Sequence, residues 1–204
     1  ALSAADVVDA TSLEAGTIRL TMNGGLGEDL LLGSEDDDLI NGGDGDDTAM
    51  MGAGNDTFTW NPGDDNDTLE GQAGTDAMLF NGANVAEQIV VSASGSRVFF
   101  TRDIATVTMA LNEVESIDFS ARGGADTITI NDLSGTDVTD IDLRLESALG
   151  SGVGDAQPDN VIVNGTGGDD VVVVVGDAGD VLVAGLAAQV AIFTAEAAND
   201  RLTI

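Results

Sequence analysis

The 204-residue sequence contains no cysteine, histidine, tyrosine or lysine, and its six basic residues are all arginines. Without cysteine there are no disulfides and no thiol nucleophile, and without histidine there is no imidazole base and no Cys/His zinc site. The longest purely aliphatic run is Val171 to Val175, far short of a membrane span. The composition therefore excludes thiol, imidazole and lysine catalysis and predicts no membrane insertion.

Acidic charge dominates the composition. Asp and Glu total 37 residues, which gives a formal net charge of −31 at pH 7. Such a chain repels nucleic acids and anionic membranes and attracts cations. However, 43% of the residues are hydrophobic, too many for a disordered acidic tail. We therefore expect no nucleic-acid partner, and a chain that folds once its charge is neutralised.

A nine-residue repeat lies in the most acidic stretch. Between Arg19 and Arg97 there are 16 acidic residues and no basic one. Six units follow the template GGxGxDxUx, in which U is apolar, and Trp60 and Asn61 interrupt the series and are expected to bulge out. The sixth position is Asp29, Asp38, Asp47, Asp56, Asp67 and Asp76, and the eighth is Leu31, Ile40, Ala49, Phe58, Leu69 and Met78.

The template predicts a turn followed by a short strand. Glycines permit the positive φ angles of a tight turn, and the apolar eighth position faces inward from a strand. Two units then make one coil, so the aspartates of alternate units line the same edge, and Asp29 opens the first edge. Rows of carboxylates at the strand spacing of about 4.8 Å need a cation between them. No base is available, and calcium accepts both carboxylate and carbonyl oxygens. Solvent-facing caps are the alternative, which the fixed glycines disfavour.

Residues 24–79 resemble the RTX repeats of hemolysin-type calcium-binding proteins. The resemblance implies a parallel β-roll with calcium between turns two units apart. The earlier turn would supply the carbonyls of positions two and four and its Asp, and the later turn the carbonyls of positions one and three and its Asp. The implied sites are Gly25, Gly27, Asp29, Gly42, Asp44 and Asp47; Ser34, Asp36, Asp38, Met51, Ala53 and Asp56; Gly43, Gly45, Asp47, Pro62, Asp64 and Asp67; and Gly52, Gly54, Asp56, Gly71, Ala73 and Asp76.

Residues 83–204 lack the strict repeat but keep strand-like alternation. A looser motif places small residues, an Asp and an apolar strand in series at Asp126, Asp170 and Asp200. It predicts longer, irregular coils of a continuing solenoid, with aspartates that accept turn amides; degenerate calcium sites are the alternative. Arg97 and Arg102 flank two phenylalanines on a predicted hairpin and are expected to pair with surface acids.

The sequence therefore predicts an all-β fold, a parallel β-roll that continues into an irregular β-solenoid or β-helix. The expected domains are an N-terminal coil leading into the repeats (1–23), a calcium-binding β-roll (24–82) and an irregular β-solenoid (83–204). The chain ends in what reads as a strand, which indicates a piece of a longer polypeptide.

The predicted function is that of a calcium-binding structural module, not an enzyme, that folds on binding Ca²⁺ outside the cell. The resemblance implies a bacterial secreted or surface protein exported by type I secretion. One alternative is a calcium-dependent polysaccharide lyase or epimerase with Arg97 or Arg102 as its base. Another is an adhesin module that binds a glycan or a cell-surface partner through residues 83–204.

Overall fold

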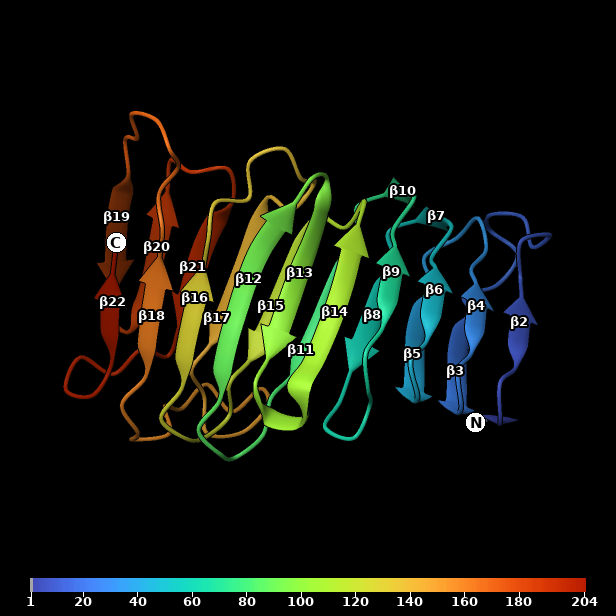
Figure 1. The fold of residues 1–204 in the computed structure, drawn as a ribbon, viewed down its shortest axis with the longest axis horizontal. Helices are drawn as coiled ribbons and strands as arrows, with labels where there is room; N and C mark the ends of the chain where they lie inside the picture. Colours follow the sequence, from blue (N-terminus) through green and yellow to red (C-terminus); the bar gives the residue numbers. More distant parts are fainter. Residues whose placement is uncertain (1) are drawn as a thin grey trace.

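The computed structural model describes residues 2–204, and nearly all of its regular structure is β-strand. The one helical segment in that range is the 3₁₀ turn η1 (Ile104–Thr106). No helix among the described residues is long and apolar enough to span a membrane. The chain advances along one axis, from the N-terminus at the right of Figure 1 to the C-terminus at the left. The predicted all-β, mainly parallel fold is confirmed.

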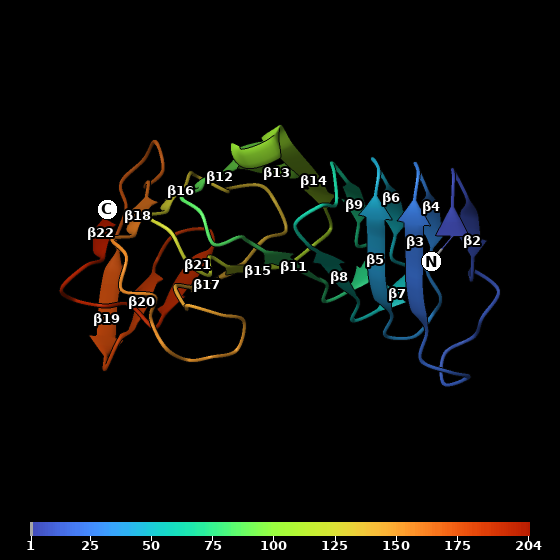
Figure 2. The ribbon, with the colours of Figure 1, turned by 90° about the horizontal axis from the view of Figure 1, so that it is seen from below.

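Two sheets of ten strands each, called sheet A and sheet B, face one another along this axis (Figure 2). Sheet A has the order β1 (Leu2–Ser3), β3 (Thr21–Leu26), β5 (Leu39–Asp44), β8 (Thr57–Trp60), β11 (Ala77–Asn81), β15 (Ser116–Ser120), β17 (Asp140–Arg144), β21 (Gln189–Phe193), β20 (Asp180–Ala184) and β19 (Val173–Asp177). Sheet B has the order β2 (Val7–Asp9), β4 (Leu30–Leu32), β6 (Thr48–Met50), β9 (Thr68–Glu70), β14 (Val107–Asn112), β13 (Arg97–Arg102), β12 (Gln88–Ser94), β16 (Thr127–Ile130), β18 (Asn160–Val163) and β22 (Arg201–Thr203). In the turns, β7 (Ala53–Gly54) pairs with β10 (Ala73–Gly74).

The core is a ladder of apolar side chains from each sheet. In sheet A, the parallel register stacks Met22, Ile40, Phe58, Met78, Ile117, Ile141 and Val190 in one row. All of these side chains are buried, as are the eighth-position residues of the repeats. Residues that are paired across neighbouring parallel strands project to the same face of the sheet. Each new strand therefore extends the core if it has one inward apolar residue in register with that row.

The second half departs from the regular coil in two places. In sheet B, β12, β13 and β14 form an antiparallel meander, which is the predicted hairpin with one further strand. At the far end of sheet A, β19 and β20 form an antiparallel hairpin beside β21. Between them the parallel coils continue, so the predicted irregular solenoid is confirmed. The division between residues 82 and 83 falls between β11 and β12 and stays a prediction.

Trp60 itself does not bulge out as the sequence suggested, although the coil that contains the insertion is longer than the coil before it. Trp60 is the last residue of β8 and is fully buried, and its ring stacks on Phe80 with centroids 4.0 Å apart. Its indole N–H donates to the carbonyl of Asp65 (2.9 Å). The two extra residues are accommodated in the turn that follows, which lengthens this coil to 20 residues. The physical reason is that burial of the large apolar Trp60 ring stabilises the fold, whereas the polar residues of the following turn lose nothing by remaining in solvent.

Trp60 therefore serves as a reporter of folding. We expect its emission maximum to lie at short wavelength in calcium and to shift to the red when EDTA is added, because the ring loses its stack on Phe80. Fluorescence of the wild-type chain checks this, since Trp60 is its only tryptophan. An emission maximum that is the same with and without calcium would show that this part of the core forms without metal.

Candidate metal centre

The sixth-position aspartates form a hydrogen-bonded ladder along each edge of the solenoid. In each step, the main-chain N–H of one aspartate donates to Oδ1 of the aspartate two units later. The contacts are Asp29 to Asp47 (2.7 Å), Asp47 to Asp67 (3.0 Å), Asp38 to Asp56 (2.7 Å) and Asp56 to Asp76 (2.8 Å). The structure thus groups the aspartates on two edges as the repeat predicts.

The other carboxylate oxygen of most repeat aspartates is buried without a hydrogen-bond partner. These atoms are Oδ2 of Asp29, Asp47, Asp56, Asp67 and Asp76. A buried carboxylate oxygen that is left unpaired costs free energy. Within residues 2–204, no three acidic side chains converge on one point. A cation at these oxygens therefore needs main-chain carbonyls as well as carboxylates.

In three of these turns, a glycine at position one leaves a space beside the unpaired oxygen, at Asp29, Asp47 and Asp76. A Cβ on Gly24 would lie 2.4 Å from Oδ2 of Asp29 and 2.5 Å from the carbonyl oxygen of Gly42. A Cβ on Gly42 would lie 2.2 Å from Oδ2 of Asp47. No side chain fits there, whereas a cation that prefers oxygen ligands would meet a carboxylate and a carbonyl. The residues present therefore fit calcium.

On the first edge, the structure brings the ligands of the first implied site together. The carbonyls of Gly25 and Gly27 are directed at the next turn, because a Cβ on Gly43 or Gly45 would lie 2.2 or 2.3 Å from them. The carbonyl of Asp44 accepts the N–H of Gly27 (2.7 Å).

The third implied site, also on the first edge, is less regular. A Cβ on Gly63 would meet nothing within 4 Å, so the turn that contains Pro62 and Asp64 does not stack on the turn before it. The Asp64 carboxylate instead turns inward and accepts the N–H of Asn61 (2.7 Å). The structure therefore does not bring Pro62 against Gly43 and Gly45 in the repeat register.

On the second edge, the turns of the second and fourth implied sites remain in register. Ala53 and Ala73 are paired through β7 and β10, and a Cβ on Gly52 would lie 2.2 Å from the carbonyl of Ser34. A Cβ on Gly33 would lie 1.7 Å from the carbonyl of Met51. The carbonyls of Asp36 and Gly54 likewise face the turns that follow them, and Gly71 occupies position one of the last turn. Asp38 differs from the other repeat aspartates because Ser34 N–H donates to its Oδ2 (2.7 Å).

Burial raises the pKa of four repeat aspartates in the metal-free chain. Desolvation is the largest cause in each case, and neighbouring carboxylates add to it. The pKa rises to about 6 for Asp47 and Asp76, about 7 for Asp56 and about 8 for Asp67. The ionised carboxylates therefore oppose folding at neutral pH when no cation is present.

These shifts predict opposite pH dependences with and without calcium. A carboxyl whose pKa is higher in the folded chain than in the unfolded chain binds more protons when folded, so metal-free stability rises as pH falls from about 8 to about 5. Calcium competes with those protons, so calcium affinity falls over the same window. We expect the far-UV strand signal in EDTA to be larger at pH 5 than at pH 8, and the calcium midpoint to be higher at pH 5. A strand signal in EDTA that decreases on acidification contradicts this.

The sequence analysis missed two groups that continue the second edge. A Cβ on Gly71 would lie 1.6 Å from the carbonyl of Glu113 and 2.6 Å from Oδ2 of Asp76. Asp76 also donates its N–H to the carboxylate of Glu115 (2.7 Å). The turn after the last repeat therefore presents a carbonyl and a carboxylate as the repeats do, although 39 residues separate Asp76 from Glu115. The repeat template does not extend to residues 113–115, so the sequence pattern gives no signal for these two groups.

The two hairpin arginines pair with acids, but only one pair lies near the surface. Arg97 pairs with Glu70, and both side chains are partly exposed. Arg102 is 5% exposed, pairs with buried Glu87 and lies 5.3 Å from the Trp60 ring centroid. The expectation of a surface pair is therefore wrong for Arg102. Neither guanidinium is free to act as a catalytic base.

We expect Arg102→Met to destabilise the calcium-loaded chain by about 3–5 kcal/mol, because Glu87 is left buried without its counter-charge. Arg97→Met is the matched control and should cost at most about 1 kcal/mol, as for exposed pairs. Urea unfolding in saturating calcium measures both. Adding Glu87→Gln to Arg102→Met should recover most of the loss. An equal decrease in the free energy of unfolding for the two arginine variants would show that the buried pair contributes no more to stability than the exposed pair.

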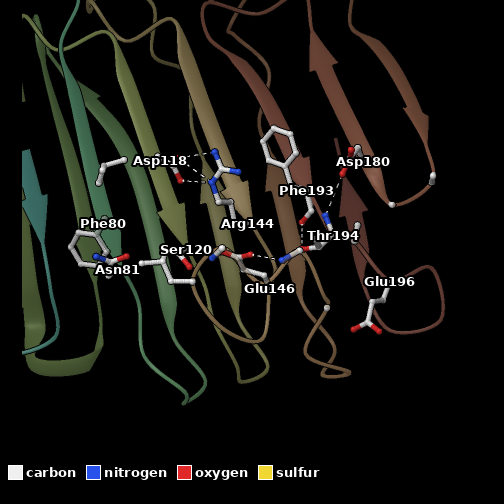
Figure 3. Close-up of a pocket in the computed structure, with 18 of the residues that line it drawn as sticks. Phe80, Asn81, Asp118, Ser120, Arg144, Glu146, Asp180, Phe193, Thr194 and Glu196 are labelled. Carbon is white, nitrogen blue, oxygen red and sulfur yellow. Dashed lines mark hydrogen bonds and ion pairs between the residues drawn. The ribbon is translucent and has the colours of Figure 1, made fainter. Parts of the chain in front are cut away.

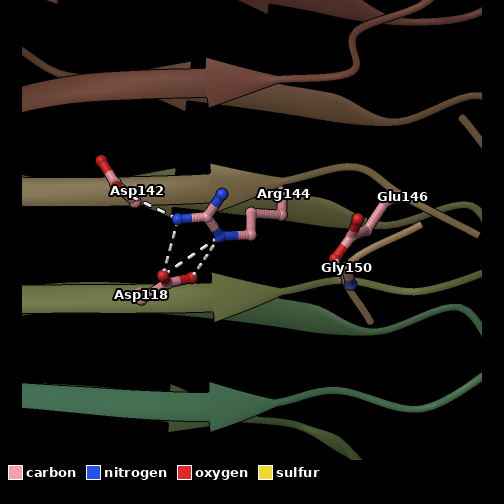
Figure 4. A network of polar contacts seen from close by, with 5 residues as sticks. All are labelled: Asp118, Asp142, Arg144, Glu146 and Gly150. Atoms are coloured by element: carbon pink, nitrogen blue, oxygen red, sulfur yellow. Dashed lines mark hydrogen bonds and ion pairs between the residues drawn. The ribbon is translucent and has the colours of Figure 1, made fainter. Parts of the chain in front are cut away.

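A cleft of about 940 Å³ opens on the outer face of sheet A near its C-terminal end (Figure 3). Arg144 lies in it, donates to both carboxylate oxygens of Asp118 (2.9 Å each) and lies 4.9 Å from the Phe193 ring centroid. Figure 4 shows Asp142 completing this network, at 3.4 Å from Arg144. Glu146 accepts the N–H of Gly150 (2.6 Å) and holds the adjoining loop. Arg144 and Asp118 thus satisfy one another, whereas Glu146 is satisfied by main-chain N–H groups.

Some aspartates of the looser motif in the second half join a ladder, and others do not. Asp200 accepts the N–H of Glu196 at one oxygen (2.6 Å) and that of Asp159 at the other (3.1 Å), so it bonds turn amides as expected. Asp170 accepts Thr166 alone, through its N–H (2.9 Å) and hydroxyl (2.8 Å). Asp170 therefore caps its own turn and joins no ladder.

Comparison with known proteins identifies the repeats. No curated protein sequence matches the chain significantly. Among solved structures, the extracellular lipase LipA from Serratia marcescens is similar at 13% identity and a TM-score of 0.36, and the match covers 87% of this chain and 40% of that one. This chain thus spans less than half the length of that lipase. Residues 23–58 and 63–84 match the RTX calcium-binding nonapeptide repeat in four copies. The chain therefore carries a block of RTX repeats, and its cofactor is calcium.

Proposed function

We propose that this chain is a calcium-dependent structural module of a larger secreted or cell-surface protein. The observation that carries the proposal is the row of five buried Oδ2 atoms that have no partner among the described residues. A bound cation satisfies such atoms, and calcium suits their oxygen environment. Calcium would thus contribute folding free energy directly, because the unfolded chain has no preformed site.

The ligand sets proposed for the four sites are those implied by the repeat. The first, second and fourth have support from the stacking of their turns, whose position-two and position-four carbonyls face the next turn. In the third, the departure of the turn around Pro62 favours the carboxylate of Asp64 as a ligand in place of its carbonyl. The Asp64 side chain lies near enough to Asp47 and Asp67 to raise their pKa values.

The proposed role in secretion follows from charge. In a calcium-poor cytoplasm, the repeats would remain unfolded because their carboxylates repel one another and no base compensates them. Outside the cell, calcium would fold them. This agrees with passage through a type I secretion channel as an unfolded chain, and with a non-enzymatic role in the exported protein.

Limited proteolysis of the whole chain at two free calcium concentrations tests this role. At about 1 mM calcium, typical of extracellular modules, we expect residues 20–82 to resist cleavage. At about 0.1 µM, in the range of intracellular sensors, we expect cleavage throughout the repeats. Mass spectrometry of the fragments locates the cuts. Equal protection at both concentrations would refute folding on export.

A glycan-binding or polysaccharide-acting role is the second candidate, and the cleft beside Arg144 is the observation that favours it. Asp118 and Asp142 lie opposite each other on neighbouring strands there, and Phe193 offers an aromatic face. Incubation with polyuronates in calcium, followed by absorbance of unsaturated products, tests lyase activity. Affinity electrophoresis of wild type and Arg144→Ala tests binding. Absence of both effects leaves the structural role alone.

A further inference from the structure

The aspartate ladder of the first edge resumes in residues 83–204, beyond the RTX match. Asp126 accepts the N–H of Glu87 at Oδ1 (2.7 Å), and its own N–H donates to Oδ1 of Asp159 (2.9 Å). These are the contacts that join successive aspartates in the repeats. The turns 121–126 and 154–159 are therefore neighbours on this edge, in the relation that two repeat turns have.

The turn 121–126 has the backbone of a repeat turn although its sequence differs. The φ angles of Arg122 and Gly124 are 66° and 131°, against 103° and 133° for Gly43 and Gly45. For arginine this left-handed conformation is strained and persists only where the surroundings impose it. The conformation thus reflects the stacking of the turn and not the preference of its residues.

A left-handed second residue accompanies every unpartnered aspartate oxygen in residues 2–204. The pairs are Gly25 and Asp29, Gly43 and Asp47, Gly52 and Asp56, Gly63 and Asp67, Gln72 and Asp76, and Arg122 and Asp126. In two turns whose second residue is not left-handed, the N–H of that residue caps the corresponding oxygen, as Ser34 does for Asp38 (2.7 Å) and Glu196 for Asp200 (2.6 Å). The turn 121–126 therefore shares the left-handed second residue and the unpartnered aspartate oxygen of five repeat turns.

Asp126 is buried in an acidic environment and has no ion-pair partner among residues 2–204. It is 1% exposed. Asp155 brings a further carboxylate to the turn, where it accepts the N–H of Gly124 (3.0 Å). Glu196 adds another on the far side of the second turn, where it accepts the N–H of Ala156 (2.7 Å).

We propose that the turns 121–126 and 154–159 bind one further divalent cation, with calcium preferred. Asp126 and Asp159 supply carboxylate oxygens, and main-chain carbonyls of the two turns complete the site, as in the repeats. The neighbouring position on the same edge needs no metal, because the Arg102 guanidinium neutralises Glu87 there. At this one position of the edge, an arginine of the chain thus takes the role that a bound cation has at the others.

The calcium stoichiometry of the full chain tests this site. Isothermal titration and native mass spectrometry are applied to wild type, Asp126→Asn and the matched control Asp170→Asn, whose carboxylate caps its own turn. We expect Asp126→Asn to bind one ion fewer and Asp170→Asn to bind as many as wild type. Asn is isosteric and uncharged, so Asp126→Asn should also raise the urea midpoint in EDTA while gaining less from calcium. An unchanged ion count in Asp126→Asn overturns the proposal, and Asp126 is then a protonated carboxyl.

Arg122→Gly provides a second test that removes no ligand. Glycine takes the left-handed conformation without strain, so this variant should bind the same number of ions as wild type, with one of them at least two-fold tighter. If the ion tightened by Arg122→Gly is still bound in the double variant with Asp126→Asn, the site is misplaced. Asp56→Asn separates this proposal from the function of the repeats, because it removes repeat ions only. If wild type binds no calcium at all, the proposed function itself is refuted.

Discussion

Removing calcium with EDTA is expected to abolish most of the strand signal of residues 20–82 in far-UV circular dichroism. The stretch from residue 20 to 96 holds 16 acidic residues and no base, and its buried carboxylate oxygens lack partners. Each site filled at a hundred times its dissociation constant contributes about 2.7 kcal/mol. Four such sites give about 11 kcal/mol, which is comparable with the whole stability of a typical domain. The repeats should therefore be unfolded without metal.

The control for this experiment is magnesium at the same concentration. Magnesium requires a strict octahedral site and retains its waters, so it should restore little of the signal. Hydrogen exchange should show a graded loss, since residues 83–204 have the pairs of Arg102 with Glu87 and Arg144 with Asp118 to hold them. A spectrum that is unchanged in EDTA contradicts calcium-dependent folding.

Replacing Asp56 by Ala is expected to remove two calcium ions, whereas replacing Asp38 removes one. Asp56 stands between Asp38 and Asp76 in the ladder of the second edge, so the ligand scheme assigns it to two sites. Asp38 is the first aspartate of that edge and serves one. Each lost ion removes up to about 2.7 kcal/mol at hundred-fold saturation. The calcium midpoint should therefore rise further for Asp56→Ala.

Calorimetric stoichiometry of the two variants checks this register directly. The second edge is the better place for the comparison, because the first edge does not begin at Asp29 as the sequence indicated. β1 and β2 add a coil before it, and Asp6 donates its N–H to Oδ1 of Asp29 (2.7 Å). If Asp56→Ala and Asp38→Ala lose equal numbers of ions, each turn is a separate site and calcium does not bridge turns two units apart.

The sequence alone determined the regular half of the solenoid. Strict nine-residue spacing fixes turn, strand and inward side chain by local rules, so the edges, the buried eighth positions and calcium as the cofactor all follow from residues 24–79. For the second half, the same rules predicted the fold class but not which residues meet, since its coils differ in length. The ladder step is 18 residues from Asp29 to Asp47 but 33 from Asp126 to Asp159.

Only the tertiary structure decided which groups meet in the irregular half. Asp159 lies on the ladder and Asp170 does not, although Asp170 has the better motif, because coil length and not local pattern sets the register. The Arg102 and Glu87 pair forms because the meander of β12 to β14 folds back across sheet B. Trp60 enters the core because Phe80 in the next coil offers it a face. Each of these contacts joins residues whose separation no short repeat encodes, so packing had to select them.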